Sequence, residues 1–135
     1  MRAFLLLLVL GACAPIVPAA TDTAAAQASE DATAELAVIG DGDGAVVLIS
    51  VVDRKPVALD TGKPAHLMIG GAMTEAVMLD APSMRQRGDR IATGASYRVS
   101  AKAAQELARG SSVAVELSIA GVYRHFQASR ADLFQ

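Results

Sequence analysis

The chain of 135 residues is poor in aromatic side chains: it has no tryptophan, two tyrosines and three phenylalanines. Its core must therefore be built from valine, leucine, isoleucine, methionine and alanine. Proteins that bind single-stranded nucleic acid stack the bases on aromatic rings, and sugar-binding surfaces usually expose rings of the same kind. The composition argues against both functions, and we expect no nucleic-acid partner.

Residues that bind metal ions are also scarce. Cys13 is the only cysteine, so no disulfide can form within the chain. His66 and His125 are the only histidines, and they lack both cysteine partners and the His-Glu-x-x-His spacing of zinc peptidases. Residues 41–44 (Asp-Gly-Asp-Gly) begin like a calcium-binding loop, but Val52 stands where a glutamate would close it. We expect no metal ion and no cofactor, and we interpret residues 41–44 as a hairpin turn.

The N-terminal apolar run, residues 3–10, is too short to cross a bilayer, which takes roughly 20 residues. It follows Arg2, as in a secretory signal peptide. Leu10-Gly11-Ala12-Cys13 then resembles the lipobox of bacterial lipoproteins, in which a branched apolar residue and two small residues precede a cysteine. The resemblance implies that residues 1–12 are removed and that the Cys13 thiol carries diacylglycerol.

Another cleavage site of the A-x-A form, residues 26–28, lies far beyond the apolar run, so the lipobox is the better interpretation. Several acyl chains, such as palmitate, hold a protein on a membrane almost permanently. Ala14 stands where an aspartate would retain an enterobacterial lipoprotein at the inner membrane. The resemblance therefore implies a lipid-anchored protein of the cell envelope, at the outer membrane and facing the periplasm.

The rest of the chain divides by composition into a tether and a domain. Residues 13–33 are rich in alanine, threonine, proline and small polar residues and show no periodicity, so we expect a flexible tether. Residues 34–135 have the length of one globular domain.

The pattern of residues 34–135 predicts mostly strands. Residues 113–119 alternate, with valine, leucine and isoleucine on one face and Glu116 and Ser118 on the other. Gly70-Gly71 joins two further strands as a tight hairpin. Residues 100–110 predict one helix. Other strands are expected at 35–40, 45–53, 65–69, 72–79, 96–100 and 122–127. The fold class is α+β or mainly β: a small antiparallel β-sandwich or open barrel with one short helix.

Charge is divided unevenly along the chain. Residues 22–80 hold ten acidic and three basic residues, whereas residues 81–135 hold eight basic and four acidic ones. This basic C-terminal half is a candidate surface for an envelope protein or an anionic membrane, although acidic and basic strands pairing within one sheet explains it too. The eight basic residues are Arg85, Arg87, Arg90, Arg98, Lys102, Arg109, Arg124 and Arg130.

Asp60-Thr61-Gly62 is the one motif that points to catalysis. With the apolar residues before it, the motif resembles the active-site loop of retropepsins, and Ile119-Ala120-Gly121 resembles their second apolar-apolar-Gly element. The resemblance implies a homodimeric aspartic peptidase in which Asp60 of each copy shares one proton.

Other features of the same region favour a turn. Lys63-Pro64 follows the motif where retropepsins have a small residue, and the helix expected at 100–110 replaces strands of that family. Asp, Gly and Pro are also the residues of ordinary turns. We therefore favour a non-catalytic binding or scaffolding module over a peptidase that uses Asp60. A carrier of an amphiphilic ligand is a third interpretation, which requires an enclosed apolar cavity.

Overall fold

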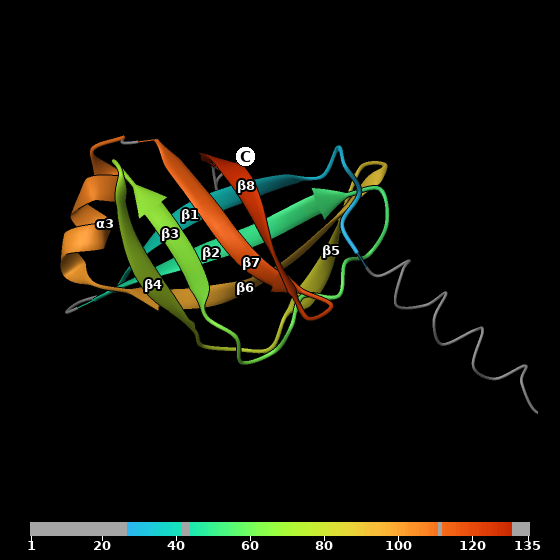
Figure 1. Ribbon diagram of the computed structural model, residues 1–135, viewed down its shortest axis with the longest axis horizontal. Coiled ribbons are helices and arrows are strands. Elements are labelled where there is room, and N and C mark those ends of the chain that lie inside the picture. The colour runs from blue at the N-terminus through green and yellow to red at the C-terminus, as the bar shows by residue number, and fades with distance from the viewer. Residues whose placement is uncertain (1–26, 42–43, 111, 131–135) are drawn as a thin grey trace, which may run out of the picture.

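The computed structural model describes residues 27–41, 44–110 and 112–130. Seven strands close into a barrel in the order β2-β1-β8-β7-β3-β4-β6, because β6 also pairs with β2 (Figure 1). Within these ranges β5 pairs with β6 alone. The mainly β fold with one short helix, expected from the sequence, is confirmed. The elements are β1 (Thr33–Asp41), β2 (Gly44–Asp53), β3 (Ala65–Ile69), β4 (Ala72–Met78), β5 (Ser83–Arg87), β6 (Arg90–Val99), α3 (Ala101–Ala108), β7 (Val113–Ile119) and β8 (Val122–Arg130).

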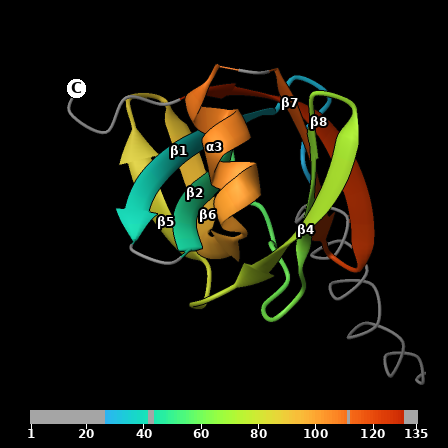
Figure 2. The same cartoon turned by 90° about the vertical axis from the view of Figure 1, so that its left-hand side faces the viewer.

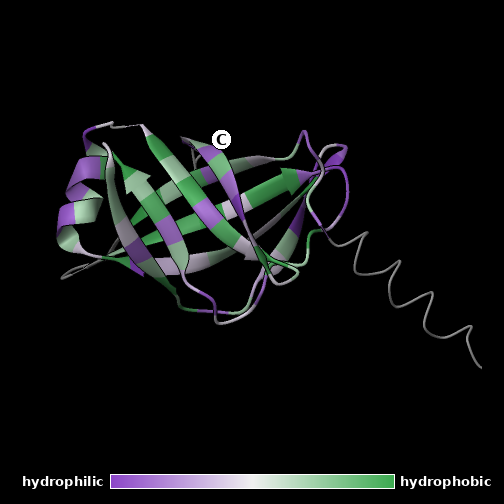
Figure 3. Ribbon diagram, in the orientation of Figure 1, coloured by the Kyte–Doolittle hydropathy of each residue, from purple (hydrophilic) through white to green (hydrophobic). Residues whose placement is uncertain are grey.

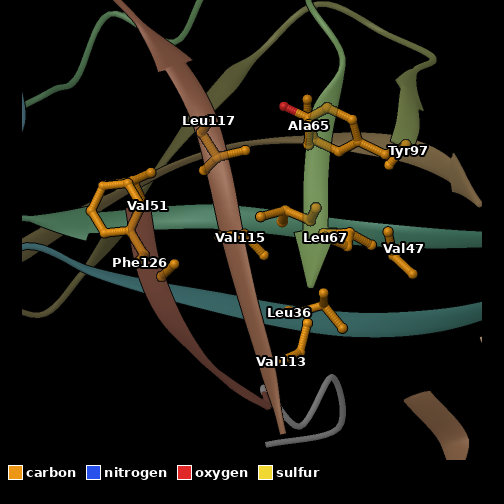
Figure 4. Close-up of a cluster of buried hydrophobic side chains, with 14 of the residues drawn as sticks. Leu36, Val47, Val51, Ala65, Leu67, Tyr97, Val113, Val115, Leu117 and Phe126 are labelled. Carbon is orange, nitrogen blue, oxygen red and sulfur yellow. The ribbon is translucent and has the colours of Figure 1, made fainter. Parts of the chain in front are cut away.

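Side chains fill the barrel, as expected for a barrel of about eight strands. In β7 the residues predicted to face the core, Val113, Val115, Leu117 and Ile119, are all buried. On the opposite face Glu116 is partly exposed, whereas Ala114 and Ser118 are buried too, so the predicted exposure of Ser118 is wrong. Figure 4 shows β7 residues beside Leu67 of β3 in one apolar cluster. Among the described residues, no buried side-chain nitrogen or oxygen lacks a hydrogen-bond partner.

Two contacts close the barrel. β1 and β8 pair in parallel over a short stretch, from Ala34 opposite Ala128 to Leu36 opposite Arg130, whereas the sequence suggested an antiparallel sheet throughout. β2 pairs with β6 along its length, and the two backbones approach closely at Gly94. A Cβ atom on Gly94 would lie 2.3 Å from the Ser50 Oγ and 2.6 Å from a backbone oxygen of β2, so only glycine fits there without rearrangement.

The two ends of the barrel differ. Helix α3 lies across one end, where the Ser100 Oγ accepts a hydrogen bond from the Ala103 N–H (3.1 Å) and Leu107 is buried (Figure 2). This confirms the predicted helix and its N-cap. The other end carries residues 27–32, the loop of residues 54–64 and the β7–β8 turn. Hydrophilic residues concentrate in α3 and in the loops at this second end (Figure 3).

The sequence predicted the β3–β4 hairpin but not the β5–β6 hairpin. The β3–β4 hairpin turns at Gly70 and Gly71 with positive φ angles of 59° and 89°, as predicted. β5 and the first half of β6 were not predicted, because neither segment alternates between apolar and polar residues. Cys13 and the centre of the 41–44 turn lie outside the described residues. Within the described ranges, no helix is long and apolar enough to span a membrane.

Candidate functional site

Asp60 lies in a loop that runs beside β7. Val57 and Leu59 of this loop are buried, and Leu59 forms an isolated bridge with Ile119 at the end of β7. β3 then pairs with the same strand, with His66 opposite Glu116. Residues 60–64 are therefore an excursion: the chain leaves the edge of β7 after Leu59 and returns to it at β3.

Hydrogen bonds of Asp60 and Ala58 hold this loop against the β7–β8 turn. Its carboxylate Oδ2 accepts from the Ser118 Oγ at 2.6 Å and from the Gly121 N–H at 2.8 Å. Its own N–H donates to the Ser118 carbonyl at 2.9 Å, and the Ala120 N–H donates to the Ala58 carbonyl at 2.8 Å. Four hydrogen bonds thus join the loop to the turn at one place.

The residues after Asp60 are held as well. The Gly62 N–H donates to the Met78 sulfur at 3.1 Å, and the Tyr123 hydroxyl donates to the Pro64 carbonyl at 3.0 Å. The Tyr123 ring stacks on His66, with centroids 4.9 Å apart. These contacts fasten the loop to β4, β3 and β8 and leave Lys63 exposed to solvent.

The structure therefore brings together the two motifs that resemble retropepsin elements, since Asp60 and Gly121 are hydrogen-bonded. An aspartic peptidase needs two carboxyl groups that share one proton. The partners that the described chain gives to the Asp60 carboxylate are a hydroxyl and a backbone amide. This arrangement stabilises a turn, and catalysis by Asp60 stays a prediction that requires a second copy of the chain.

Asp53, which no motif in the sequence marks, is fully buried at the end of β2. One carboxylate oxygen accepts from the Ser29 N–H at 2.8 Å, and the other accepts from the Arg54 N–H at 2.6 Å. Burial raises the pKa of Asp53, but the bonds from Ser29 and Arg54 and the charge of Lys55 outweigh it, so the pKa is lowered. Asp53 thereby fixes the segment that leads into β1.

Both histidines lie in one row across the outer surface of the sheet. The row runs from Glu75 on β4 through His66 and Glu116 to His125 on β8. The His66 Nδ1 is 3.5 Å from the Glu116 Oε1. In the part of the chain that the structure describes, no three His, Cys, Asp or Glu side chains are arranged to hold a metal ion.

Shallow clefts on the surface of the described residues include the following two. The larger, of about 200 Å³, lies between the β3–β4 hairpin and α3, and includes Met73, Lys102 and Glu106. The smaller, of about 40 Å³, lies on the outer face of β2, β6 and β5 beside Ser50 and Arg85. Sites for small organic ligands usually measure 300–1,000 Å³, so both clefts fall below that range.

The basic residues of the C-terminal half do not share one face. Arg85, Arg87 and Arg90 belong to the β5–β6 hairpin, whereas Lys102 belongs to α3 at the opposite end and Arg109 is the C-cap of that helix. Arg87 pairs with Glu35 of β1, so part of the charge is neutralised within the sheet.

Comparisons with protein-family models, with curated proteins and with solved structures found no match.

Proposed function

We propose that this protein is a small lipoprotein of the cell envelope whose β-barrel domain is a non-catalytic binding or scaffolding module. The observation that carries this proposal is the hydrogen bonding of Asp60, the one catalytic candidate in the sequence. Its carboxylate is bonded to Ser118 and Gly121 of its own chain. Because side chains also fill the barrel, binding takes place on the outer surface.

The proposed anchor limits where the partner lies. Thirteen residues separate Cys13 from Gln27, where the described chain begins. An extended chain spans at most about 3.5 Å per residue, so this segment reaches roughly 45 Å. The barrel therefore acts within roughly that distance of the membrane that holds the acyl chains, and its partner is another component of the same envelope.

Labelling with a radioactive fatty acid tests the anchor. Cys13→Ser should abolish the label and leave the precursor unprocessed at this position, because acylation requires the thiol. Ala14→Ser is the matched control, since it alters the neighbouring residue and keeps the thiol, and it should be labelled normally. An unlipidated mature protein that begins at Ser29 would contradict the anchor.

The retropepsin-like peptidase is the second candidate, favoured by the contact between Asp60 and Gly121. The test is pepstatin-sensitive cleavage of unfolded proteins between about pH 3 and pH 7, where a shared-proton pair would work. We expect no cleavage by the wild type or by Asp60→Asn. Cleavage that rises with protein concentration, disappears in Asp60→Asn and survives in Asp89→Asn, an exposed turn variant, would establish the peptidase instead.

A further inference from the structure

β5 is an edge strand on an otherwise closed barrel. Among the described residues it pairs only with β6, from Ser83 opposite Gly94 to Arg87 opposite Arg90. Every residue of β5 is exposed. Its second edge is therefore open to hydrogen bonding with another chain.

The geometry of the β5–β6 turn shows which backbone groups are open. Gly88, with φ of 64°, and Asp89 form a two-residue turn, so the flanking pair Arg87 and Arg90 exchanges hydrogen bonds. Hydrogen-bonded pairs alternate along an antiparallel ladder. The N–H and C=O groups of Met84 and Gln86 consequently point away from β6, toward the open edge.

The side chains around this edge are basic. β5 contributes Arg85 and Arg87, and β6 begins with Arg90, whereas Asp89 is the only acid of the hairpin. Arg87 is paired with Glu35. Arg85 is exposed and borders the small groove on the outer face of the sheet. The edge therefore combines open backbone groups with a net positive charge.

The positive charge favours one of two candidate partners for this edge, an acidic segment of another protein over a second copy of the chain. A second copy of the chain paired through β5 in antiparallel fashion would set arginines opposite or diagonal to arginines, and like charges across a strand pair are destabilising. An extended segment with acidic side chains at alternate positions would place carboxylates beside Arg85 and Arg87 instead. Strand addition of this kind draws affinity from the main chain and specificity from alternate side chains.

We propose that β5 is the docking strand for an extended acidic segment of another envelope protein, which adds to the sheet beside Met84 and Gln86. The inference rests on the proposed function, because it names the partner of the binding module. It also explains why β5 exists although the barrel closes without it.

The test is fluorescence anisotropy with the full chain in detergent and a labelled, end-capped peptide of alternating threonine and glutamate. We expect saturable binding that weakens as salt rises. Arg85→Glu should weaken binding at least tenfold. Lys102→Glu, which makes the same charge change on α3 at the other end of the barrel, should alter binding less than twofold.

A second pair of measurements tests strand addition itself. Met84→Pro removes an N–H that points away from β6 and spares the β5–β6 hydrogen bonds, so it should weaken binding at least tenfold. If that variant does not fold, a peptide N-methylated at alternate residues makes the same test on the ligand, because one methylation register blocks its bonding edge. We expect one of the two registers to abolish binding.

Three outcomes would overturn the proposal: no binding of the acidic peptide, equal binding of a threonine–lysine peptide, or binding that neither Met84→Pro nor methylation affects. The first would mean that the arginines only protect an open edge from aggregation. Peptide binding by the Cys13→Ser chain should equal that of wild type. Loss of the lipid anchor, or cleavage of the peptide, can therefore be distinguished from loss of peptide binding at β5.

Discussion

The Asp60 turn and the β5 edge lie on the same barrel and differ in how their polar groups are satisfied. At the Asp60 turn, a motif typical of catalysis has its carboxylate bonded to Ser118 and Gly121. At β5, a stretch with no recognisable motif leaves the backbone groups of Met84 and Gln86 without a partner strand in the described chain. Polar groups bonded within the chain stabilise the fold, whereas open ones are available to a partner.

The largest expected effect comes from the strand beneath the Asp60 turn. Leu117→Asp places a charge in the filled interior and should cost roughly 4 kcal/mol or more, enough to unfold a marginal domain. Glu116→Lys, the neighbouring residue on the outer face, should cost less than about 1 kcal/mol. Urea denaturation followed by circular dichroism measures both, and equal losses would mean that the faces of β7 are misassigned.

Gly94→Ala tests the pairing of β2 with β6, which closes the barrel and leaves β5 at an edge. The added Cβ would meet Ser50 and the β2 backbone well inside contact distance, so we expect a loss of about 2–3 kcal/mol. Ser96→Ala, two residues along the same strand, should change the free energy of unfolding by less than about 0.5 kcal/mol. A stable Gly94→Ala domain would show that β2 and β6 are not in such close contact.

Asp53 should make stability depend on pH. Its pKa is lower in the folded protein than in the unfolded chain, so its contribution is fully present above the unfolded pKa of about 3.9. The contribution is lost as pH falls through the folded pKa. Asp53→Asn should cost about 2 kcal/mol at pH 7 and flatten the acid limb of the stability curve. Asp89→Asn, at an exposed site, is the control, and an equal response in both variants would contradict this role.

The smallest effect is the coupling at the Asp60 turn. Asp60→Asn keeps an oxygen that can accept the same bonds and should cost about 1 kcal/mol or less. In a double-mutant cycle with Ser118→Ala we expect a coupling of about 0.5–1 kcal/mol. The control cycle pairs Asp60→Asn with Thr61→Ala, whose side chain is exposed, and should give almost none. Zero coupling with Ser118 would mean that their hydrogen bond does not form.

The elements that the sequence predicted are those whose conformation leaves a local residue pattern. β7 was predicted because large apolar side chains on its inward face alternate with small or polar residues on its other face. β5 is exposed on both faces, so nothing in its residues distinguishes it from a loop. The β3–β4 turn was predicted because Gly70-Gly71 carries its conformation locally.

The candidate site was less predictable, because its bonds join distant parts of the chain. Asp60 was recognised as a turn or catalytic residue, but its partner Ser118 is 58 positions away. Asp53 is bonded to Ser29, 24 positions away, and nothing near it in sequence marks it as buried. Such pairs depend on strand order, which the local pattern does not contain.

Residue-by-residue hydrogen exchange of the unliganded protein, followed by NMR, tests the comparison most directly. We predict that the Gly121, Ala120 and Asp60 amides are protected by the bonds of the turn. The Met84 and Gln86 amides should exchange nearly as fast as in an unfolded chain, while those of Arg85 and Arg87, bonded to β6, exchange slowly. Protected amides at Met84 and Gln86 together with an unprotected Gly121 would contradict the account, because the edge would be covered and the Asp60 carboxylate would be unbound.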